Sequence, residues 1–410
     1  MLFEAPDMED VKDALFERYI TAFEEWDHLK KQKHLAVKKV YAADGRYHPE
    51  KYEEMGIPPG GPLSLKPAGD HYYMYGLDIL GRPCFSQHRN TQGTIYQEGF
   101  YSFGEQWIEY IEYNVATQKP VVLQRIQLHK KQKRMYQQLL LNNGGPGKTY
   151  DGLSRPQIAA RLKEAEYDRF CCIELYQYRG NRIIAADCWA SYPGYTPGNY
   201  KKKFTYLPSG ELNTIRDNYS NGTSKYVFVR MPDNMSLDEL SDKLAQQMAQ
   251  VIAAACARRS PHAPIAMLQL SYQEIGNYIP YVTAITTNTK DQIFRETPRE
   301  ELQLQLFTSA EYEHIPVPHE KYEQLFVAFM NKIEKDKNFD LATGMIRKTG
   351  YLLTTNRMYG KVPVDADFIA YAVDWSMTFE EEEIYQILID CGITAATMTK
   401  WKELGLFTGI

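Results

Sequence analysis

The amino-acid sequence predicts an α+β protein of two domains, each an antiparallel β-meander with helices packed on one face. Its 410 residues exceed the size at which a single hydrophobic core usually stops growing. Segments with apolar residues at every third or fourth position alternate with series of short, aromatic-rich strands. A polar, glycine-rich stretch at 142–153 separates two such series, and we expect it to be the linker between the domains.

The first predicted domain, residues 1–141, begins with an amphipathic helix at 8–39. The apolar residues that share one face of this helix are Val11, Leu15, Tyr19, Ala22, Trp26 and Leu29. The next segment, residues 43–69, contains several prolines and is expected to be a loop. The short, aromatic-rich segments that follow predict strands at 72–77, 84–89, 94–103, 106–113 and 120–128. We expect a helix over 129–141, which the asparagines and glycines of the linker end.

The second predicted domain, residues 154–410, combines a second meander with C-terminal helices. A helix capped by Ser154 precedes strands at 169–178, 182–190, 202–207, 212–216 and 225–231. Ser236 and Glu239 have the spacing of a capping box, so a well-marked helix begins there. Later strands are expected at 265–272, 281–287 and 368–373, and later helices near 299–307, 319–335, 339–348, 378 and 394.

Composition and charge favour a cytoplasmic protein with an ordinary core. Hydrophobic residues make up 44% of the chain and charged residues 24%, values typical of globular proteins. The N-terminus shows no basic residues followed by an apolar run, and no stretch reaches the length of a membrane span, so we expect no secretory signal and no membrane partner. The six cysteines form no C-x-x-C pair, which favours reduced, buried thiols.

No motif predicts a cofactor, a metal site or a catalytic residue. His319-Glu320 begins like a zinc-protease motif, but position 323 is Glu where the second histidine ligand would stand. The string at 142–149 ends like a phosphate-binding loop, but it lacks the first glycine and the flanking strand and helix. The sequence therefore leaves open whether the protein is an enzyme and favours the view that it is not.

Two basic clusters, at 130–134 and 201–203, lie near tyrosines. Aromatic and basic residues together are what single-stranded nucleic acid binding requires. Lysines on strand edges are also commonly solvated charges that prevent aggregation, and the formal net charge of −5 argues against a chain built to neutralise phosphates. Nucleic acid is therefore an unlikely partner.

One segment has the composition of a recognition loop. Between 187 and 200, aromatic side chains alternate with two Pro-Gly pairs, and rigid aromatics on such a loop give contact area at low entropic cost. The predicted binding-surface residues are Asp187, Trp189, Tyr192, Tyr195 and Tyr200. The alternative is that these aromatics simply cover the sheet beneath them.

The leading functional hypothesis is a protein-binding module. The alternation of small α+β units is similar to that of proteins from bacterial toxin–immunity loci, which implies an immunity-type or regulatory role. The first alternative is an enzyme whose site combines dispersed Asp, Glu, His and Tyr residues, and the second is a nucleic-acid-binding protein. A pocket with convergent ionisable groups would favour the enzyme, whereas a flat aromatic patch would favour the binder. The partner and the oligomeric state stay open.

Overall fold

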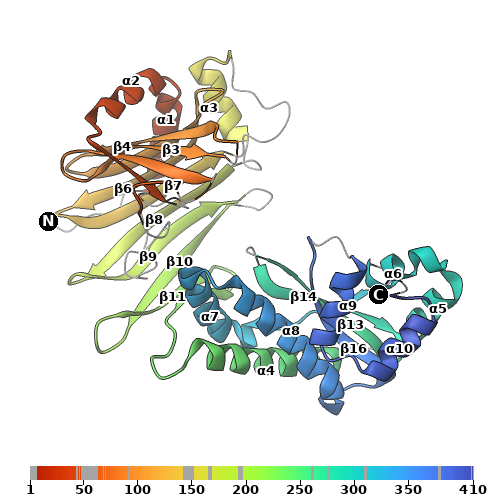
Figure 1. The fold of residues 1–410 in the computed structure, drawn as a ribbon. Helices are drawn as coiled ribbons and strands as arrows, with labels where there is room; N and C mark the ends of the chain where they lie inside the picture. Colours follow the sequence, from red (N-terminus) through yellow and green to blue (C-terminus); the bar gives the residue numbers. More distant parts are fainter. Residues whose placement is uncertain are drawn as a thin grey trace. The chain divides into compact units, whose positions relative to one another are not determined.

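The computed structural model describes most of the chain from residue 7 to residue 409. The residues outside the description are 1–6, 43–44, 46, 48–62, 68, 70, 91, 142–151, 165–168, 193–196, 260–262, 275–276, 309–311, 377–379, 408 and 410. The chain forms two compact units, Met1–Val227 and Phe228–Ile410. Both combine helices with strands, and the predicted α+β class is confirmed (Figure 1).

Unit 1 is built on a twelve-stranded sheet whose strands, as far as the chain is described, lie in sequence order, and whose last strand extends two residues past Val227. The strands are β1 (Lys38–Ala42), β2 (Tyr72–Leu77), β3 (Pro83–Arg89), β4 (Ile95–Phe103), β5 (Trp107–Asn114), β6 (Lys119–His129), β7 (Gln132–Leu141), β8 (Arg169–Arg179), β9 (Arg182–Ser191), β10 (Gly198–Tyr206), β11 (Leu212–Tyr219) and β12 (Ser224–Val229). Adjacent strands from β1 to β11 pair antiparallel, as expected for a meander with short turns.

Helices cover one face of this sheet. They are α1 (Met8–Ala22), α2 (Trp26–Lys30), the 3₁₀-helix η1 (Lys31–Leu35) and α3 (Arg155–Glu164) (Figure 1). Apolar side chains of α1, α2 and α3 join those of the sheet in one core. The single helix predicted at 8–39 is therefore wrong in its extent, because the chain turns after Ala22 and its last residues form β1. The turn brings the Trp26 ring to 5.7 Å from Phe100 and 5.2 Å from Tyr113.

The helix predicted over 129–141 is also wrong, since this segment forms β7. Lys130 and Lys131 adopt positive φ angles and make the tight turn that returns β6 as β7. β7 then pairs with β8, from Met135 opposite Leu175 to Leu141 opposite Arg169. This segment forms a strand despite its helix-like local pattern, because it pairs with a strand on each side and buries its side chains.

The pairing of β7 with β8 joins the two predicted meanders into one sheet. The strands that precede and follow 142–153 are direct neighbours, and the compact units divide the chain after Val227. This division differs from the predicted one, in which the linker at 142–153 separates two domains. Residues 142–151 of that linker lie outside the described residues.

Unit 2 contains a four-stranded sheet in the order β15-β14-β13-β16. Its strands are β13 (Ile265–Gln273), β14 (Asn277–Thr286), β15 (Glu313–His314) and β16 (Val364–Asp374). β13 and β14 are antiparallel, whereas β13 and β16 are parallel. The sheet is therefore mixed, and the prediction of an antiparallel meander in each domain does not describe it.

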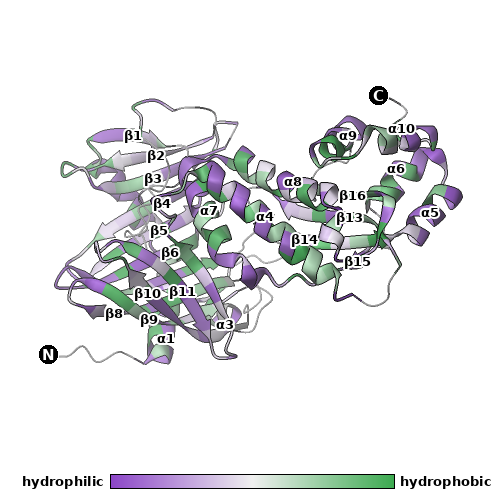
Figure 2. Ribbon diagram, turned by 90° about the horizontal axis from the view of Figure 1, so that it is seen from below, coloured by the Kyte–Doolittle hydropathy of each residue, from purple (hydrophilic) through white to green (hydrophobic). Residues whose placement is uncertain are grey.

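Helices surround this smaller sheet. They are α4 (Leu237–Cys256), α5 (Thr287–Glu296), α6 (Arg299–Thr308), the 3₁₀-helix η3 (His319–Lys321), α7 (Glu323–Asp336), α8 (Phe339–Thr355), the 3₁₀-turn η4 (Arg357–Gly360), α9 (Glu381–Asp390) and α10 (Ala395–Glu403). The predicted capping box at Ser236 and Glu239 is confirmed at the start of α4. The apolar and polar sides of α4 are visible in Figure 2, and α4 packs against α7 and α8.

Candidate functional site

The predicted recognition residues occupy two kinds of position. Trp189 on β9 is 6% exposed and joins the core beneath the helices, with the Lys12 ammonium 4.8 Å from its ring. Tyr200 on β10 is 9% exposed, and its ring lies 5.6 Å from that of Tyr219. Tyr192, by contrast, is 49% exposed and contacts Phe170. Trp189 and Tyr200 therefore cover the sheet, while Tyr192 faces solvent.

The strands extend further into the predicted loop than its prolines suggested. β9 continues to Ser191 and β10 starts at Gly198, so the connection is short. Asp187 lies on β9, where it accepts a 2.7 Å hydrogen bond from Gln177 and lies 3.5 Å from the Lys201 ammonium. Tyr195 falls outside the described residues.

The lysine run after this connection alternates between solvent and interior. Lys201 and Lys203 are exposed, but Lys202 is only 5% exposed, with its Nζ 2.6 Å from Asp217 Oδ1 and 3.7 Å from Glu174 Oε1. Burial alone would lower the pKa of Lys202, yet the two carboxylates raise it above its ordinary value. Lys202 is therefore not a solvated charge like its two neighbours, because successive strand residues point to opposite faces.

A cavity of about 570 Å³ lies beside these strands in unit 1. Asp187 and Tyr200 both line it, together with Met8, Lys201 and Tyr219. The structure thus brings two of the predicted recognition residues to one cavity.

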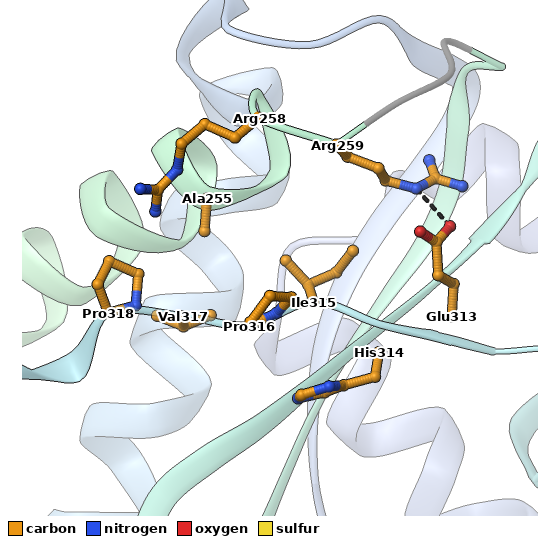
Figure 3. A pocket seen from close by; sticks show the side chains of 9 residues that line it. All are labelled: Ala255, Arg258, Arg259, Glu313, His314, Ile315, Pro316, Val317 and Pro318. Atoms are coloured by element: carbon orange, nitrogen blue, oxygen red, sulfur yellow. Dashed lines mark hydrogen bonds and ion pairs between the residues drawn. The ribbon is translucent and has the colours of Figure 1, made fainter.

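A groove in unit 2 lies between the end of α4 and the segment around β15 (Figure 3). We call it the α4–β15 groove; its volume is about 430 Å³, and it is lined by Ala255, Arg258, Arg259 and residues 313–318. The Arg259 Nε donates a 2.5 Å hydrogen bond to Glu313 Oε2 across the groove. Figure 3 shows the Arg258 guanidinium on the other side, near Ala255 and Pro318 and directed away from Glu313.

The groove runs along an edge of the four-stranded sheet. β15 pairs with β14 on one side, with Thr283 opposite His314, and it is the last strand of the described sheet on the other side. Pro316 and Pro318 follow β15, and since proline has no N–H, this segment cannot continue a regular ladder. The exposed Tyr281 ring stacks on His314 at 4.3 Å with an interplanar angle of 3°.

The charges and surfaces of the groove suit an anionic, partly apolar ligand. Ala255, Val317 and the prolines supply apolar contacts, and Arg258 and Arg259 supply two positive charges against the single negative charge of Glu313. Among the described residues, no hydrogen bond or ion pair to the Arg258 side chain is found, whereas Arg259 is paired. A planar guanidinium in this position can bind a carboxylate through two parallel hydrogen bonds.

A third pocket, of about 660 Å³, lies at the carboxyl ends of the parallel strands β13 and β16. Tyr272, Glu274 and Asp374 come from the strand ends. α8 and α9 contribute further ionisable groups, namely Asp340, Arg347, Lys348, Glu383 and Asp390. Burial raises the pKa of Tyr272. Carboxyl ends of parallel strands are where open α/β sheets commonly bind ligands.

Within these ionisable groups, several are already engaged by the protein itself. Arg347 Nη1 donates a 2.7 Å hydrogen bond to Asp390 Oδ2, and Asp374 accepts hydrogen bonds from the backbone N–H groups of Glu274 and Ser376.

Across the described ranges, no three His, Cys, Asp or Glu side chains are placed to share a metal ion. No helix of the described chain is long and apolar enough to cross a bilayer.

Sequence reasoning did not select the residues of the α4–β15 groove. Arg258 and Arg259 follow Ala257, the C-cap residue of a long helix, and cations near a helix C-terminus ordinarily interact with the helix dipole. Their partners are Glu313 and the Pro316–Pro318 segment, which lie more than fifty positions later in the chain. The only local signal was the pair of alternating prolines, which marks an extended segment.

No protein-family model matches the chain, and no curated protein matches its sequence.

Proposed function

We propose that the protein is a cytoplasmic protein-binding module that takes a short acidic segment of its partner in the α4–β15 groove. The observation that carries this proposal is the exposed Arg258 guanidinium beside an apolar floor at a sheet edge. A role of the immunity or regulatory type would follow if the bound partner is thereby inhibited or controlled.

The edge strand offers backbone as well as side chains to such a segment. An extended peptide can add to a sheet edge through main-chain hydrogen bonds, with side-chain pockets providing specificity. Because β15 has only two residues and Pro316 follows it, few ladder bonds are available. The side-chain anchors, above all a carboxylate on Arg258, must then provide much of the affinity.

A peptide-display selection tests this proposal. Random peptides selected on the full chain should be enriched in Asp and Glu, and Arg258→Glu should weaken their binding by about tenfold or more, equivalent to about 1.4 kcal/mol. Arg295→Glu, at an exposed position of α5, is the matched charge reversal and should leave binding unchanged. Equal binding by wild type and Arg258→Glu, at equal melting temperature, would contradict the proposal.

The β13–β16 pocket favours an enzyme as the second candidate function. It collects ionisable groups of both signs at strand ends, which is the arrangement expected of a dispersed catalytic site. If this pocket is catalytic, an activity found by substrate screening should be lost in Asp374→Asn, while peptide binding at the α4–β15 groove persists.

The state of the cysteines supports a cytoplasmic location. All six thiols are buried and none forms a disulfide. Cysteines without disulfides are typical of proteins in a reducing compartment such as the cytoplasm. Nucleic acid stays the least favoured partner, since the 201–203 cluster turns one of its three lysines into the protein interior.

A further inference from the structure

We propose that His71 and His88 in unit 1 form a binding site for a divalent transition metal such as Cu²⁺ or Zn²⁺. This site is independent of the α4–β15 groove and of the function proposed for it. His88 lies on β3 and is 8% exposed, whereas His71 directly precedes β2 and is exposed. Their Nε2 atoms are 3.2 Å apart, within hydrogen-bond distance, so a bound metal ion would replace this direct contact.

The register of the sheet places the two imidazoles together. Tyr73 is directly opposite His88 in the pairing of β2 with β3. His71 is two residues before Tyr73, so an extended chain directs both side chains to the same face. The Tyr73 ring stacks on His88 with centroids 3.9 Å apart and an interplanar angle of 15°, which holds the His88 ring in place.

The separation of the two nitrogens matches what a metal requires. Metal–nitrogen bonds of about 2.0–2.1 Å at a tetrahedral angle put two ligand nitrogens about 3.3 Å apart. The exposed His71 ring can adjust its rotamer so that both lone pairs converge on one ion. Imidazole ligands suit copper, zinc and nickel, and among the divalent first-row ions Cu²⁺ binds most tightly.

The second ring nitrogen of His88 also has a hydrogen-bond partner, as is usual for histidines that bind a metal through their other nitrogen. Its Nδ1 lies 3.1 Å from the side-chain oxygen of Gln97. Because a carbonyl oxygen only accepts, it favours the tautomer with the proton on Nδ1 and the lone pair on Nε2. A hydrogen bond of this kind fixes the tautomer and the ring orientation of metal ligands.

Tyr96 completes the polar surroundings of His88. Its hydroxyl oxygen lies 2.8 Å from His88 Nε2 and 2.5 Å from Nδ1. A phenol hydroxyl in this position can hydrogen bond with the imidazole. The two imidazoles are then the protein ligands, and water or an external group takes the remaining positions.

Titration of the full chain with CuCl₂ and with ZnCl₂ tests the site. One metal ion should bind saturably per chain, and His71→Gln should weaken binding by about tenfold or more, the scale at which lost support of a metal ligand acts. His71 is exposed, so its replacement should leave the fold unchanged, and the melting temperature without metal verifies this. His34→Gln removes another exposed histidine of unit 1 as the matched control and should leave affinity unchanged.

Electron paramagnetic resonance of the Cu²⁺ complex provides a second readout. Two coordinated imidazoles should be seen in the wild-type chain and one in His71→Gln. The proposal is overturned if no saturable binding occurs, if His71→Gln binds as tightly as wild type, or if His34→Gln causes the same loss, since that last result means adventitious surface binding only.

Discussion

Gly99 on β4 leaves the space that the ring of Tyr110 on β5 fills. A Cβ atom at residue 99 would lie 2.3 Å from the Tyr110 hydroxyl oxygen. The fully buried Tyr110 donates a 2.6 Å hydrogen bond to Glu112 Oε2 and lies 3.2 Å from Ser86 Oγ. The absence of a side chain at one strand position therefore permits a buried aromatic and its polar network on the next strand.

Replacing Gly99 with Ala should destabilise unit 1 by about 1–3 kcal/mol, because the added methyl group overpacks the site and displaces the Tyr110 ring. Urea unfolding measures this change. Gly198→Ala is the matched control, since a Cβ at that position meets no atom within 4 Å. A Gly99→Ala protein as stable as Gly198→Ala would show that the sheet adjusts without cost.

The carboxyl group of Glu112 should make stability depend on pH. Burial raises its pKa to about 7, although the hydrogen bond from Tyr110 opposes the shift. The folded protein thus holds this proton more tightly than the unfolded chain does. The stabilisation from the protonated group is complete below about pH 4.5 and is lost as the pH rises through 7.

Glu112→Gln should remove this pH dependence. Between pH 4.5 and pH 8, the free energy of unfolding of the wild type relative to Glu112→Gln should fall by about 3 kcal/mol, at about 1.4 kcal/mol per pKa unit. Urea unfolding at both pH values measures it. Glu105→Gln, at an exposed position, should follow the wild type. Parallel curves for wild type and Glu112→Gln would rule out the raised pKa.

Lys202→Met should cost about 3–5 kcal/mol of stability, because it leaves Glu174 and Asp217 buried without their cation. Lys201→Met, one residue earlier and with its side chain 80% exposed, should change stability by less than about 0.5 kcal/mol. Thermal melts of the two variants give the comparison. Equal effects would mean that strand alternation does not separate these lysines.

The two tyrosines around the 192–197 connection should respond differently to truncation. Tyr200→Ala removes a buried ring and should cost about 3–5 kcal/mol, the range for large core aromatics. Tyr192→Ala should cost less than about 1 kcal/mol, because half of that side chain is exposed. A folded and stable Tyr200→Ala protein would assign Tyr200 to a surface instead.

Cleavage between residues 142 and 151 should not separate the chain into two independent domains. A protease site introduced there can be cut after purification, and we expect the pieces to co-elute in gel filtration because β7 and β8 stay paired. Separation into two pieces that each keep a cooperative melting transition would instead support a domain boundary at 142–153.

Local patterns in the sequence determined the α+β class and the best-marked elements. The Ser236–Glu239 signature placed the start of α4, and the strands predicted at 169–178 and 182–190 agree with β8 and β9 to within one residue at each end. Capping and turn chemistry act over a few neighbouring residues, so one sequence contains all the information they need.

Only the tertiary structure decided how these elements are used. Residues 132–141 became a strand because β6 and β8 pair with them on both sides. Lys202 became buried because Asp217 lies opposite it on β11 and Glu174 on β8 lies within ion-pair distance. Arg258 and Pro318 line one groove only because β15 and its flanking segment lie at the end of α4. Pairing and burial depend on neighbours far away in the chain, and these neighbours are set by the packed fold rather than by local sequence.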